Sequence, residues 1–376
     1  MAIKNFTFDR SLADPFIRFG YDHYKGDNNW IPPFKEELYQ QLSPYYPFYS
    51  KKGNDHRHFL ALAGNRVVGR ISAMVNSDLL DKDGTAVGTI GFFECIEDYQ
   101  VASDLLSTAT GWLHEKLGFK RIWGPMNFDI WHSYRFMTKG YDQKVFYGEP
   151  YNKPYYPDFF ERFGLIRKQV WDSIEITERS VLEKMIARGA RRHQMLLSRG
   201  YRFVTFNEHV FRKELRKLHY ILTETFSGFL GFTPLSFTEF EQLFSKSRYA
   251  LNPRLIVFAY DENNKLAGFA LALLEVSDAI QSMNGKDNLI GKLRFLHNLR
   301  HVNRINFYAG GITSEEIAKM SGLARAGFYC VIRQALDEGY ENIMMTLMAK
   351  NNKVHGLLGK NMKKTVREYT LYELNL

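Results

Sequence analysis

Cysteine is nearly absent from the sequence. Only Cys95 and Cys330 occur in 376 residues, and they do not form a CxxC pair. Two isolated cysteines argue against a disulfide framework and against a cysteine-based zinc site. The composition therefore fits a protein of a reducing compartment.

Long apolar runs are also missing. The longest mainly apolar stretch, 266–276, has half of the roughly 20 residues that a membrane-spanning helix needs. The first ten residues contain no apolar segment of the kind found in signal peptides. With 45% apolar and 24% charged residues, the composition is close to that of an average soluble protein. We therefore expect a globular, cytoplasmic protein, whose length suits two domains.

Positive charge is concentrated in the second half of the chain. Residues 1–180 contain 22 Lys and Arg against 23 Asp and Glu, whereas residues 181–376 contain 28 against 18. The basic half favours an anionic partner, such as a phosphorylated cofactor, a nucleic acid or a membrane surface. A solvated basic surface explains the same charge, so composition alone does not identify the partner.

The two halves of the chain repeat one pattern, which begins with a hairpin. Residues 58–75 predict two strands joined by the tight turn Gly64-Asn65. Residues 254–273 predict a second hairpin, which turns at 261–264. A repeated hairpin at this spacing indicates two similar domains.

A third strand, a long amphipathic helix and a further strand follow each hairpin. They are predicted at 86–95, 101–117 and 120–125, and again at 304–311, 322–338 and 342–348. Each helix ends at a glycine, Gly118 or Gly339, as is typical of a C′ residue. Strand, helix and strand at this length indicate a parallel crossover. A short helix, at 157–163 or 353–360, and a final strand pair complete each half.

The segments before the hairpins set the predicted domain limits. The second half begins with a strand at 201–206 and two helices at 211–226 and 236–245. The first half opens similarly but is rich in Pro and Tyr, which predict its helices less clearly. We interpret the basic, helix-prone segment 179–200 as a linker helix. It separates a domain at 1–178 from a domain at 201–376.

Several sequence stretches are distinctive at the residue level. They are Gly91-Phe-Phe-Glu-Cys-Ile-Glu-Asp, Gly124-Pro-Met-Asn-Phe, Pro150-Tyr-Asn-Lys-Pro-Tyr-Tyr-Pro, Asn352 and Tyr369-Thr-Leu-Tyr-Glu. With the order of elements, they resemble a bacterial family that has two GNAT acyltransferase-like domains in tandem. The resemblance covers most of the chain. It implies an α/β (α+β) fold, in which each domain is a mixed, mainly antiparallel sheet flanked by helices.

GNAT enzymes bind the CoA pyrophosphate at the start of their central helix, usually in a loop that reads Arg/Gln-x-x-Gly-x-Gly/Ala. Residues 319–324, Lys-Met-Ser-Gly-Leu-Ala, match this pattern with lysine in the first place. Backbone N–H groups and the helix dipole attract phosphate, and small residues allow its close approach. The resemblance implies that acetyl-CoA or another acyl-CoA binds at Lys319, Ser321, Gly322, Leu323, Ala324, Arg325 and Asn352. An ordinary helix start that contains a glycine is the alternative.

The equivalent loop of the first half departs from the pattern. Residues 96–103 contain no glycine, and Glu97 and Asp98 stand where phosphate would bind. Two carboxylates repel a pyrophosphate, and Asp98 is typical of a helix N-cap. We therefore expect that the first half does not bind CoA in the usual way and serves as a substrate-recognition or structural domain.

N-acyl transfer needs an amine that has lost its proton and a group that protonates the leaving thiolate. GNAT enzymes often use a glutamate on the strand before the loop as base, which implies Glu94. The same strand of the second half offers Tyr308. A buried structural acid and a core or pocket-lining aromatic are the respective alternatives. The usual late tyrosine is replaced by Phe160 and Leu358, so the acid stays unassigned.

The first half also provides candidates for binding the acceptor. Asn127 could orient a substrate or complete a turn. Tyr155 and Tyr156 could line a pocket or pack in the core. No metal is predicted, because the pair His56 and His58 lacks a third ligand nearby.

Residues 276–303 stand where a compact GNAT domain would have a short turn. Within them and just beyond, 291–304 combines four Lys and Arg with five apolar residues and predicts a basic amphipathic helix. Such a helix could cover the mouth of an active site, touch an anionic lipid surface or contact RNA. A helix packed on its own domain with a solvated basic face is the alternative.

The resemblance implies an acyl-CoA-dependent N-acyltransferase that moves an acetyl or longer acyl group to an amine on a small molecule or peptide. A Fem-type transferase that uses aminoacyl-tRNA is an alternative, motivated by the basic half. The neutral first half and the CoA-like loop argue against that nucleic-acid partner. The missing late tyrosine motivates a third hypothesis, a non-catalytic module that binds CoA or an acyl chain.

Overall fold

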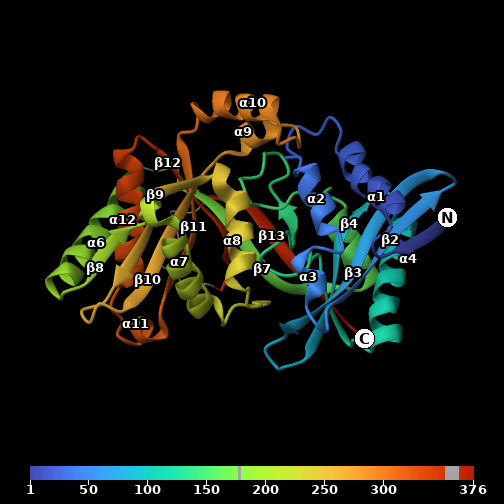
Figure 1. Cartoon of the computed structure of the whole chain (residues 1–376), viewed down its shortest axis with the longest axis horizontal. Helices are drawn as coiled ribbons and strands as arrows, with labels where there is room; N and C mark the ends of the chain where they lie inside the picture. The colour runs from blue at the N-terminus through green and yellow to red at the C-terminus, as the bar shows by residue number, and fades with distance from the viewer. Residues whose placement is uncertain (177–178, 352–363) are drawn as a thin grey trace.

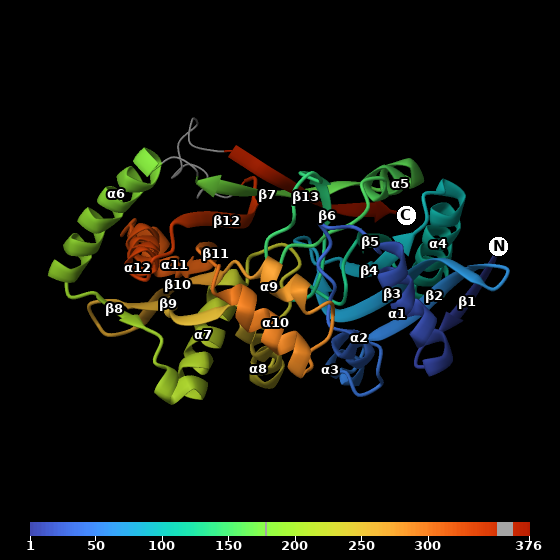
Figure 2. The same ribbon diagram turned by 90° about the horizontal axis from the view of Figure 1, so that it is seen from above.

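The computed structural model describes residues 1–176, 179–351 and 364–376. Thirteen strands form one continuous sheet through both halves of the chain (Figure 1). Helices cover both faces of the sheet (Figure 2). All neighbouring strands are antiparallel except two parallel pairs, one in each half. The predicted mixed α/β architecture is therefore confirmed.

The elements of the first half follow the predicted order. They are β1 (Ala2–Phe6), α1 (Arg10–His23), α2 (Lys35–Gln41), α3 (Pro47–Ser50), β2 (Asp55–Ala63), β3 (Arg66–Leu80), β4 (Ala86–Cys95), α4 (Tyr99–Gly111), the π-helical turn η1 (Trp112–Lys116), β5 (Arg121–Gly124), β6 (Phe136–Lys139), α5 (Tyr156–Phe163) and β7 (Ile166–Ile176). The β2–β3 hairpin has the predicted two-residue turn, because Ala63 pairs with Arg66 and Gly64 takes a φ of 60°. Asp98 caps α4 by accepting a hydrogen bond from the Gln100 amide, as predicted.

The second half follows α6 (Arg179–Ser198), the helix that is observed where the linker was predicted. Its elements are β8 (Arg202–Thr205), η2 (Glu208–Val210), α7 (Phe211–Phe226), α8 (Phe237–Lys246), η3 (Ser247–Tyr249), β9 (Leu251–Tyr260), β10 (Leu266–Leu274), α9 (Ser277–Ser282), α10 (Leu289–Leu299), β11 (Arg304–Ile312), α11 (Ser314–Ala318), α12 (Leu323–Asp337), β12 (Asn342–Ala349) and β13 (Lys364–Asn375). The basic helix predicted at 291–304 is α10, which ends at Leu299, and Arg304 already begins β11. The short helix predicted at 353–360 lies outside the described residues.

The final strands of the two halves are exchanged. The sheet order is β1-β2-β3-β4-β5-β13-β7-β12-β11-β10-β9-β8. The C-terminal strand β13 thus lies between β5 and β7 of the first half, and β7 reaches β12 of the second half. The prediction that a strand pair closes each half is wrong, because the two final strands pair with each other. Neighbouring repeats with similar strands can complete each other's sheets, and local sequence patterns do not show which partner is used.

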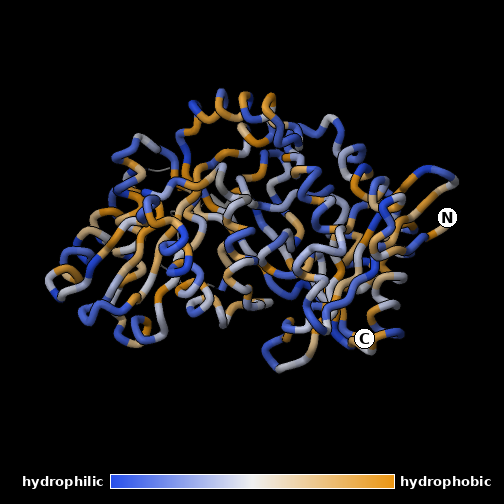
Figure 3. The backbone as a smooth tube through the Cα atoms, viewed as in Figure 1, coloured by the Kyte–Doolittle hydropathy of each residue, from blue (hydrophilic) through white to orange (hydrophobic). Residues whose placement is uncertain are grey.

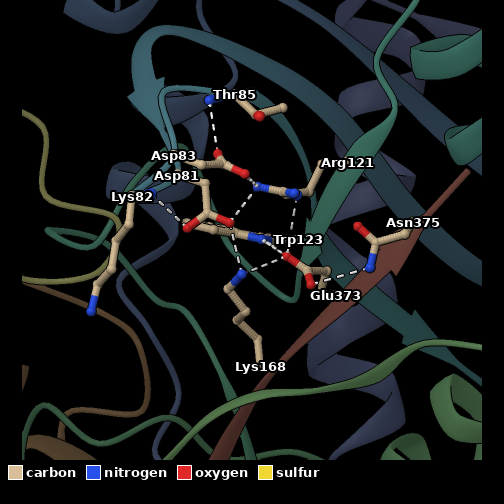
Figure 4. A network of polar contacts seen from close by, with 9 residues as sticks. All are labelled: Asp81, Lys82, Asp83, Thr85, Arg121, Trp123, Lys168, Glu373 and Asn375. Atoms are coloured by element: carbon tan, nitrogen blue, oxygen red, sulfur yellow. Dashed lines mark hydrogen bonds and ion pairs between the residues drawn. The ribbon is translucent and has the colours of Figure 1, made fainter.

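An ion-pair network fixes β13 beside β5 (Figure 4). Glu373 on β13 accepts hydrogen bonds from Trp123 Nε1 and Lys168 Nζ, each at 2.8 Å. Lys168 Nζ also reaches Asp81 Oδ2 at 2.7 Å, and Arg121 Nη1 reaches the same oxygen at 2.6 Å. The network therefore joins the β3–β4 turn, β5, β7 and β13.

A fully buried ion pair holds the other end of β13. Arg367 Nε lies 2.7 Å from Glu149 Oε2, and both side chains are 0% exposed. Glu149 also accepts hydrogen bonds from the Phe146 amide and from Ser173 on β7. Ser173 Oγ in turn accepts from the Leu347 amide on β12 at 3.0 Å. This chain of contacts ties β13, β7 and β12 together at the junction of the halves.

Each half packs helices on both faces of its part of the sheet. In the first half, α4 and α5 cover one face and α1 to α3 the other. In the second half, Phe226 of α7 contacts Phe269 on β10. Gly327 of α12 lies against the adjacent Ala270, which points to the opposite face. Helix α6 lies on α12, where a side chain at Gly189 would collide with Tyr329.

The buried Glu149–Arg367 pair gives a stability prediction. We expect Arg367→Met to lower the free energy of unfolding by about 3–5 kcal/mol, because it leaves the Glu149 carboxylate buried without its partner. The double variant Glu149→Leu/Arg367→Met should lose less than the single variant, since no unpaired charge remains. Urea unfolding followed by circular dichroism measures both.

The exposed pair between Arg333 and Asp337 provides the control. Arg333→Met should cost less than about 1 kcal/mol, because exposed ion pairs contribute little. Equal losses for Arg333→Met and Arg367→Met would contradict the special role of the buried pair.

Candidate active site

The parallel strands β11 and β12 separate at the middle of the second half. They pair from Arg304 opposite Asn342 to Phe307 opposite Met345, and beyond this point β11 stays with β10 while β12 stays with β7. Tyr308 is the extra residue of a β-bulge at this point, because Phe307 and Ala309 pair with successive residues of β10. A bulge redirects backbone amides and side chains, and bulges are frequent beside active sites.

Tyr308 lies at the junction with the first half and is 45% exposed. A side chain at Gly148 would touch its ring, since a Cβ on that glycine would lie 3.5 Å from Cε2. Arg135 of the first half is a buried neighbour, and its guanidinium stacks on the rings of Tyr134 and Trp171 at 3.8 and 4.3 Å. Among the described residues, Arg135 Nε and Nη1 have no hydrogen-bond partner. Burial lowers the pKa of this guanidinium.

The predicted CoA loop lies at the start of α12. Gly322 is the N-cap residue with a φ of 76°, a conformation that favours glycine, and it has no side chain to cap the helix. Ser321 Oγ accepts a hydrogen bond from the Leu323 amide at 3.2 Å. Leu323 is buried, whereas Ala324 and Arg325 are exposed. The helix thus presents its positive end toward solvent, where an anion can bind.

Four arginines surround this helix end. A shallow hollow of about 350 Å³ is lined by Met195 and by Arg188, Arg191 and Arg192 of α6 together with Arg325 of α12. Arg192 passes so close to Gly322 that a Cβ there would lie 2.6 Å from its Nε. Within the described chain, none of the four arginines forms an ion pair with a carboxylate. Like charges gathered without counter-charges favour the binding of an anion.

Lys319 forms ion pairs with three carboxylates. Its Nζ lies 3.1 Å from Glu315, 3.2 Å from Glu316 and 3.6 Å from Glu262. The hydrogen bonds to Glu315 and Glu316 raise the pKa of Lys319. The lysine of the predicted motif is therefore held within its own loop, and Asn352 lies outside the described residues.

In the first half, the strand bulge that corresponds to the one at Tyr308 is covered by neighbouring residues of the chain. Strand β4 has a bulge at Phe92 and Phe93, which face the single residue Ile71 of β3. The side chain of Asn127 accepts a hydrogen bond from the Phe92 amide at 2.7 Å. A Cβ on Gly91 would lie 2.4 Å from the carbonyl oxygen of Met126. The bulge that is open at Tyr308 is thus covered by its own polypeptide here.

Glu94 lies in a hydrogen-bonded cluster of the first half. Its Oε2 accepts from the hydroxyls of Tyr24 and Tyr156 at 2.8 and 2.7 Å, and Arg70 Nη2 is 3.9 Å from Oε1. Burial raises the pKa of Glu94, and Arg70 opposes the rise. Tyr155 belongs to the same cluster, because its hydroxyl donates to the Cys95 carbonyl at 2.9 Å.

The structure separates the predicted site residues into two groups. Glu94, Asn127, Tyr155 and Tyr156 lie in the first half, whereas Tyr308 and residues 319–325 lie in the second. Strands β4 and β11 are separated by four strands in the sheet, which places Glu94 and Tyr308 about 24 Å apart across it. They therefore cannot act on the same reacting atom.

A small pocket of about 50 Å³ lies between the halves. It is lined by Tyr46, Asp129 and His132 from the first half and by residues 233–243 around α8. His132 Nδ1 lies 2.7 Å from Asp129 Oδ1, and Nε2 lies 2.5 Å from the Tyr46 hydroxyl. A carboxylate that orients an imidazole in this way prepares it to accept a proton. No group of three metal-ligating side chains occurs in the described part of the chain.

Sequence reasoning missed the α6 arginines, Arg135 and His132. The spacing of Arg188, Arg191 and Arg192 on one helix is a visible signal, but a basic helix between two domains is equally typical of a linker. Arg135 and His132 give no signal, because Trp171 and Tyr46, which complete their surroundings, come from distant parts of the chain.

Two curated bacterial proteins are similar to the chain in sequence. The chain is 25% identical over 293 residues to Protein YghO of Escherichia coli, covering 76% of this chain and 71% of that protein. It is 27% identical over 288 residues to bacterial ceramide synthase of Caulobacter vibrioides, covering 73% and 70%. No protein-family model matches the sequence.

Two solved structures resemble the fold along almost the whole chain. A tandem GNAT protein from the clavulanic acid biosynthesis pathway has a TM-score of 0.54 at 11% identity, covering 100% of this chain and 98% of its own. A GCN5-related N-acetyltransferase from Sphaerobacter thermophilus has a TM-score of 0.50 at 9% identity, covering 99% and 95%. The chain has the tandem GNAT fold. The tandem GNAT architecture expected from the sequence is confirmed.

The raised pKa of Glu94 predicts a pH dependence of stability. Because the folded state favours the protonated acid, the contribution of Glu94 is fully present below its unfolded pKa and is lost as pH rises through its folded pKa. Glu94→Gln removes this titration. We expect the stability of the wild type relative to Glu94→Gln to be lower at about pH 7 than at about pH 4.5.

Urea unfolding at the two pH values measures this difference. Exposed Glu97 provides the control, and the stability of the wild type relative to Glu97→Gln should change less over the same interval. A relative stability that rises with pH for Glu94→Gln would contradict the raised pKa.

Proposed function

We propose that the protein is an acyl-CoA-dependent N-acyltransferase whose second half binds CoA. The arginine-lined hollow at the start of α12 carries this proposal. CoA has a pyrophosphate and a 3′-phosphate, so its nucleotide end carries several negative charges. Four guanidiniums beside a helix N-terminus complement those charges in both sign and number.

The two helices have separate tasks in this proposal. The start of α12 offers backbone N–H groups beside Gly322, and α6 adds three arginines above them. Arg192 approaches the loop closely because Gly322 has no side chain. The linker helix is thus part of the cofactor site, whereas Lys319 supports the loop through its carboxylate partners.

The acyl group belongs at the bulge of β11. The strands β11 and β12 diverge there, and the buried Arg135 of the first half is near enough to interact electrostatically with Tyr308. Attack of an amine on a thioester creates negative charge on the carbonyl oxygen. A fixed, poorly solvated guanidinium next to that oxygen stabilises the charge more than water does.

His132 is our candidate for the base that takes the amine proton. It is three residues from Arg135, so their backbones are at most about 11 Å apart. Asp129 orients the ring, and the Tyr46 hydroxyl links Nε2 to the pocket between the halves. Glu94 is separated from Tyr308 by four strands, which favours His132 for this role.

A long-chain amino alcohol is the first acceptor to test. The similarity to bacterial ceramide synthase supports this choice, because a ceramide is a long-chain amino alcohol that is acylated on nitrogen. Small amines and peptide amines are the other acceptor classes.

Calorimetric titration with acetyl-CoA tests the placement of the cofactor. Arg191→Ala and Arg325→Ala should each weaken binding by about tenfold or more, because each removes a charge-assisted contact to phosphate. Arg333→Ala removes the same charge ten residues beyond the start of α12, about 15 Å from the hollow, and should change the affinity less than twofold (about 0.4 kcal/mol). Equal affinities in all variants would move CoA elsewhere.

Thiol release from an acyl-CoA tests the activity. We expect release that depends on a long-chain amino alcohol, and a loss of kcat of about 100-fold or more in His132→Gln with little change in acyl-CoA affinity. Exposed His209 provides the matched control, His209→Gln. An unchanged kcat in His132→Gln would contradict its role as the base.

The acyl-CoA titration and the thiol-release assay, together with a tRNA-binding measurement, separate the alternative functions. Acyl-CoA binding without amine-dependent thiol release would favour the non-catalytic module. Salt-sensitive binding of aminoacyl-tRNA without acyl-CoA binding would favour a Fem-type transferase.

A further inference from the structure

Helix α10 exposes an apolar surface to solvent. It belongs to the segment between β10 and β11, at the outer edge of the molecule (Figure 1). Leu289, Ile290, Leu293 and Leu296 are 74%, 62%, 59% and 55% exposed. Hydrophobic colour on this outermost helix is visible in Figure 3. Four large aliphatic side chains in one short helix exceed the scattered exposure that is normal for a surface.

The exposed residues form a stripe opposite the packed side of the helix. Leu289, Leu293 and Leu296 stand at i, i+4 and i+7, which is one face of an α-helix. Gly291 and Phe295 lie on the opposite face and are buried, and the Phe295 ring contacts Tyr249. The helix is therefore already attached to its own domain by a different face.

Positive charges flank the stripe. At 100° per residue, Lys292 and Arg294 lie on either side of the line through Leu289, Leu293 and Leu296. Residues 285–304 contain five Lys and Arg and a single acid, Asp287. Asp287 lies 3.6 Å from Lys292 and also accepts a hydrogen bond from Tyr249. The face as a whole therefore stays positive.

The helix is held in this orientation. Asn288 caps its first turn by accepting a hydrogen bond from the Gly291 amide at 2.9 Å. Gln281 at the end of α9 donates to the carbonyl oxygens of Asn28 and Trp30 of the first half, each at 2.8 Å. The Lys35 amide donates to the Gly285 carbonyl. Contacts with both halves thus fix the helix with its stripe outward.

We propose that α10 docks the protein onto the surface of a bilayer that contains anionic lipids. Aliphatic side chains with basic neighbours are the composition of helices that lie in a membrane interface. Burial of the leucines among acyl chains and attraction of the basic residues to anionic headgroups would both favour binding. RNA fits this face less well, because phosphate and bases are bound by cations and aromatic rings, and an aliphatic stripe offers neither.

This docking is peripheral. In the described residues, no helix has the length and apolar character needed to cross a bilayer. Two of the roles predicted for the basic helix, as a lid and as an RNA contact, are not needed to explain the stripe. The inference rests on α10 alone and does not depend on acyl transfer.

Sedimentation with lipid vesicles tests the proposal on the full chain. The probes are vesicles of phosphatidylcholine and vesicles with about one third phosphatidylglycerol. We expect the wild type to bind the anionic vesicles at least about tenfold more tightly, and salt to weaken that binding. Leu289→Asn/Leu293→Asn/Leu296→Asn should lose binding to both kinds of vesicle, whereas Lys292→Gln/Arg294→Gln should lose the preference for anionic vesicles.

Leu80 is 51% exposed on β3 and provides the matched control, Leu80→Asn. All the changed residues are exposed, so circular dichroism should show folded variants. Equal vesicle binding by the wild type and the triple leucine variant would overturn the proposal. A dimer that forms without lipid and is lost in the triple variant would also overturn it, because a second copy of the chain would then cover the stripe.

Discussion

The pairing of β7 with β13 is the constraint on which the rest of the structure depends. These strands come from different halves of the chain, and their pairing makes one sheet out of two repeats. The buried Glu149–Arg367 pair fixes this junction from inside, and the network around Glu373 fixes it near the outer end. A buried ion pair without its partner is costly, so this arrangement tolerates few alternative registers. Residues that are far apart in the sequence thereby set the relative position of the two halves.

The two similar halves differ at their strand bulges and at the starts of their central helices. In the first half, Asn127 accepts the hydrogen bond of the Phe92 amide at the β4 bulge, and Glu97 and Asp98 lie at the helix start. In the second half, the bulge at Tyr308 faces the neighbouring half instead, and arginines surround the helix start. The loop that carries Asn127, His132 and Arg135 covers the bulge of β4 and extends toward the bulge of β11. Residues of the first half thus line one side of the β11 bulge in the second half.

Sequence patterns predicted the elements well where short-range physics decides. The turn at Gly64-Asn65, the cap at Asp98 and the glycine start of α12 all follow from residues within a few positions. The exchange of β7 and β13 was not predictable in this way. The alternation of apolar and polar residues along a strand shows which face is buried, but not which strand lies beside it. Arg135 was hidden, since Trp171, on which it stacks, is far away in the sequence. Asn127 was a candidate, but its hydrogen bond with the Phe92 amide depends on the packing of its loop against β4. The basic character of α6 was visible, but its position over Gly322 depends on helix packing at Gly189.

The position of β13 also has a consequence for synthesis on the ribosome. Strand β13 occupies the place between β5 and β7, yet it is translated after all the other described elements. Until residues 364–375 leave the exit tunnel, β5 and β7 face each other across an empty strand position. The first repeat therefore cannot complete its sheet while the second is being made, although domains usually fold in order from the N-terminus. The edges of β5 and β7 that later pair with β13 must therefore stay unpaired while the rest of the chain is made. Strand β13 then docks between these two edges.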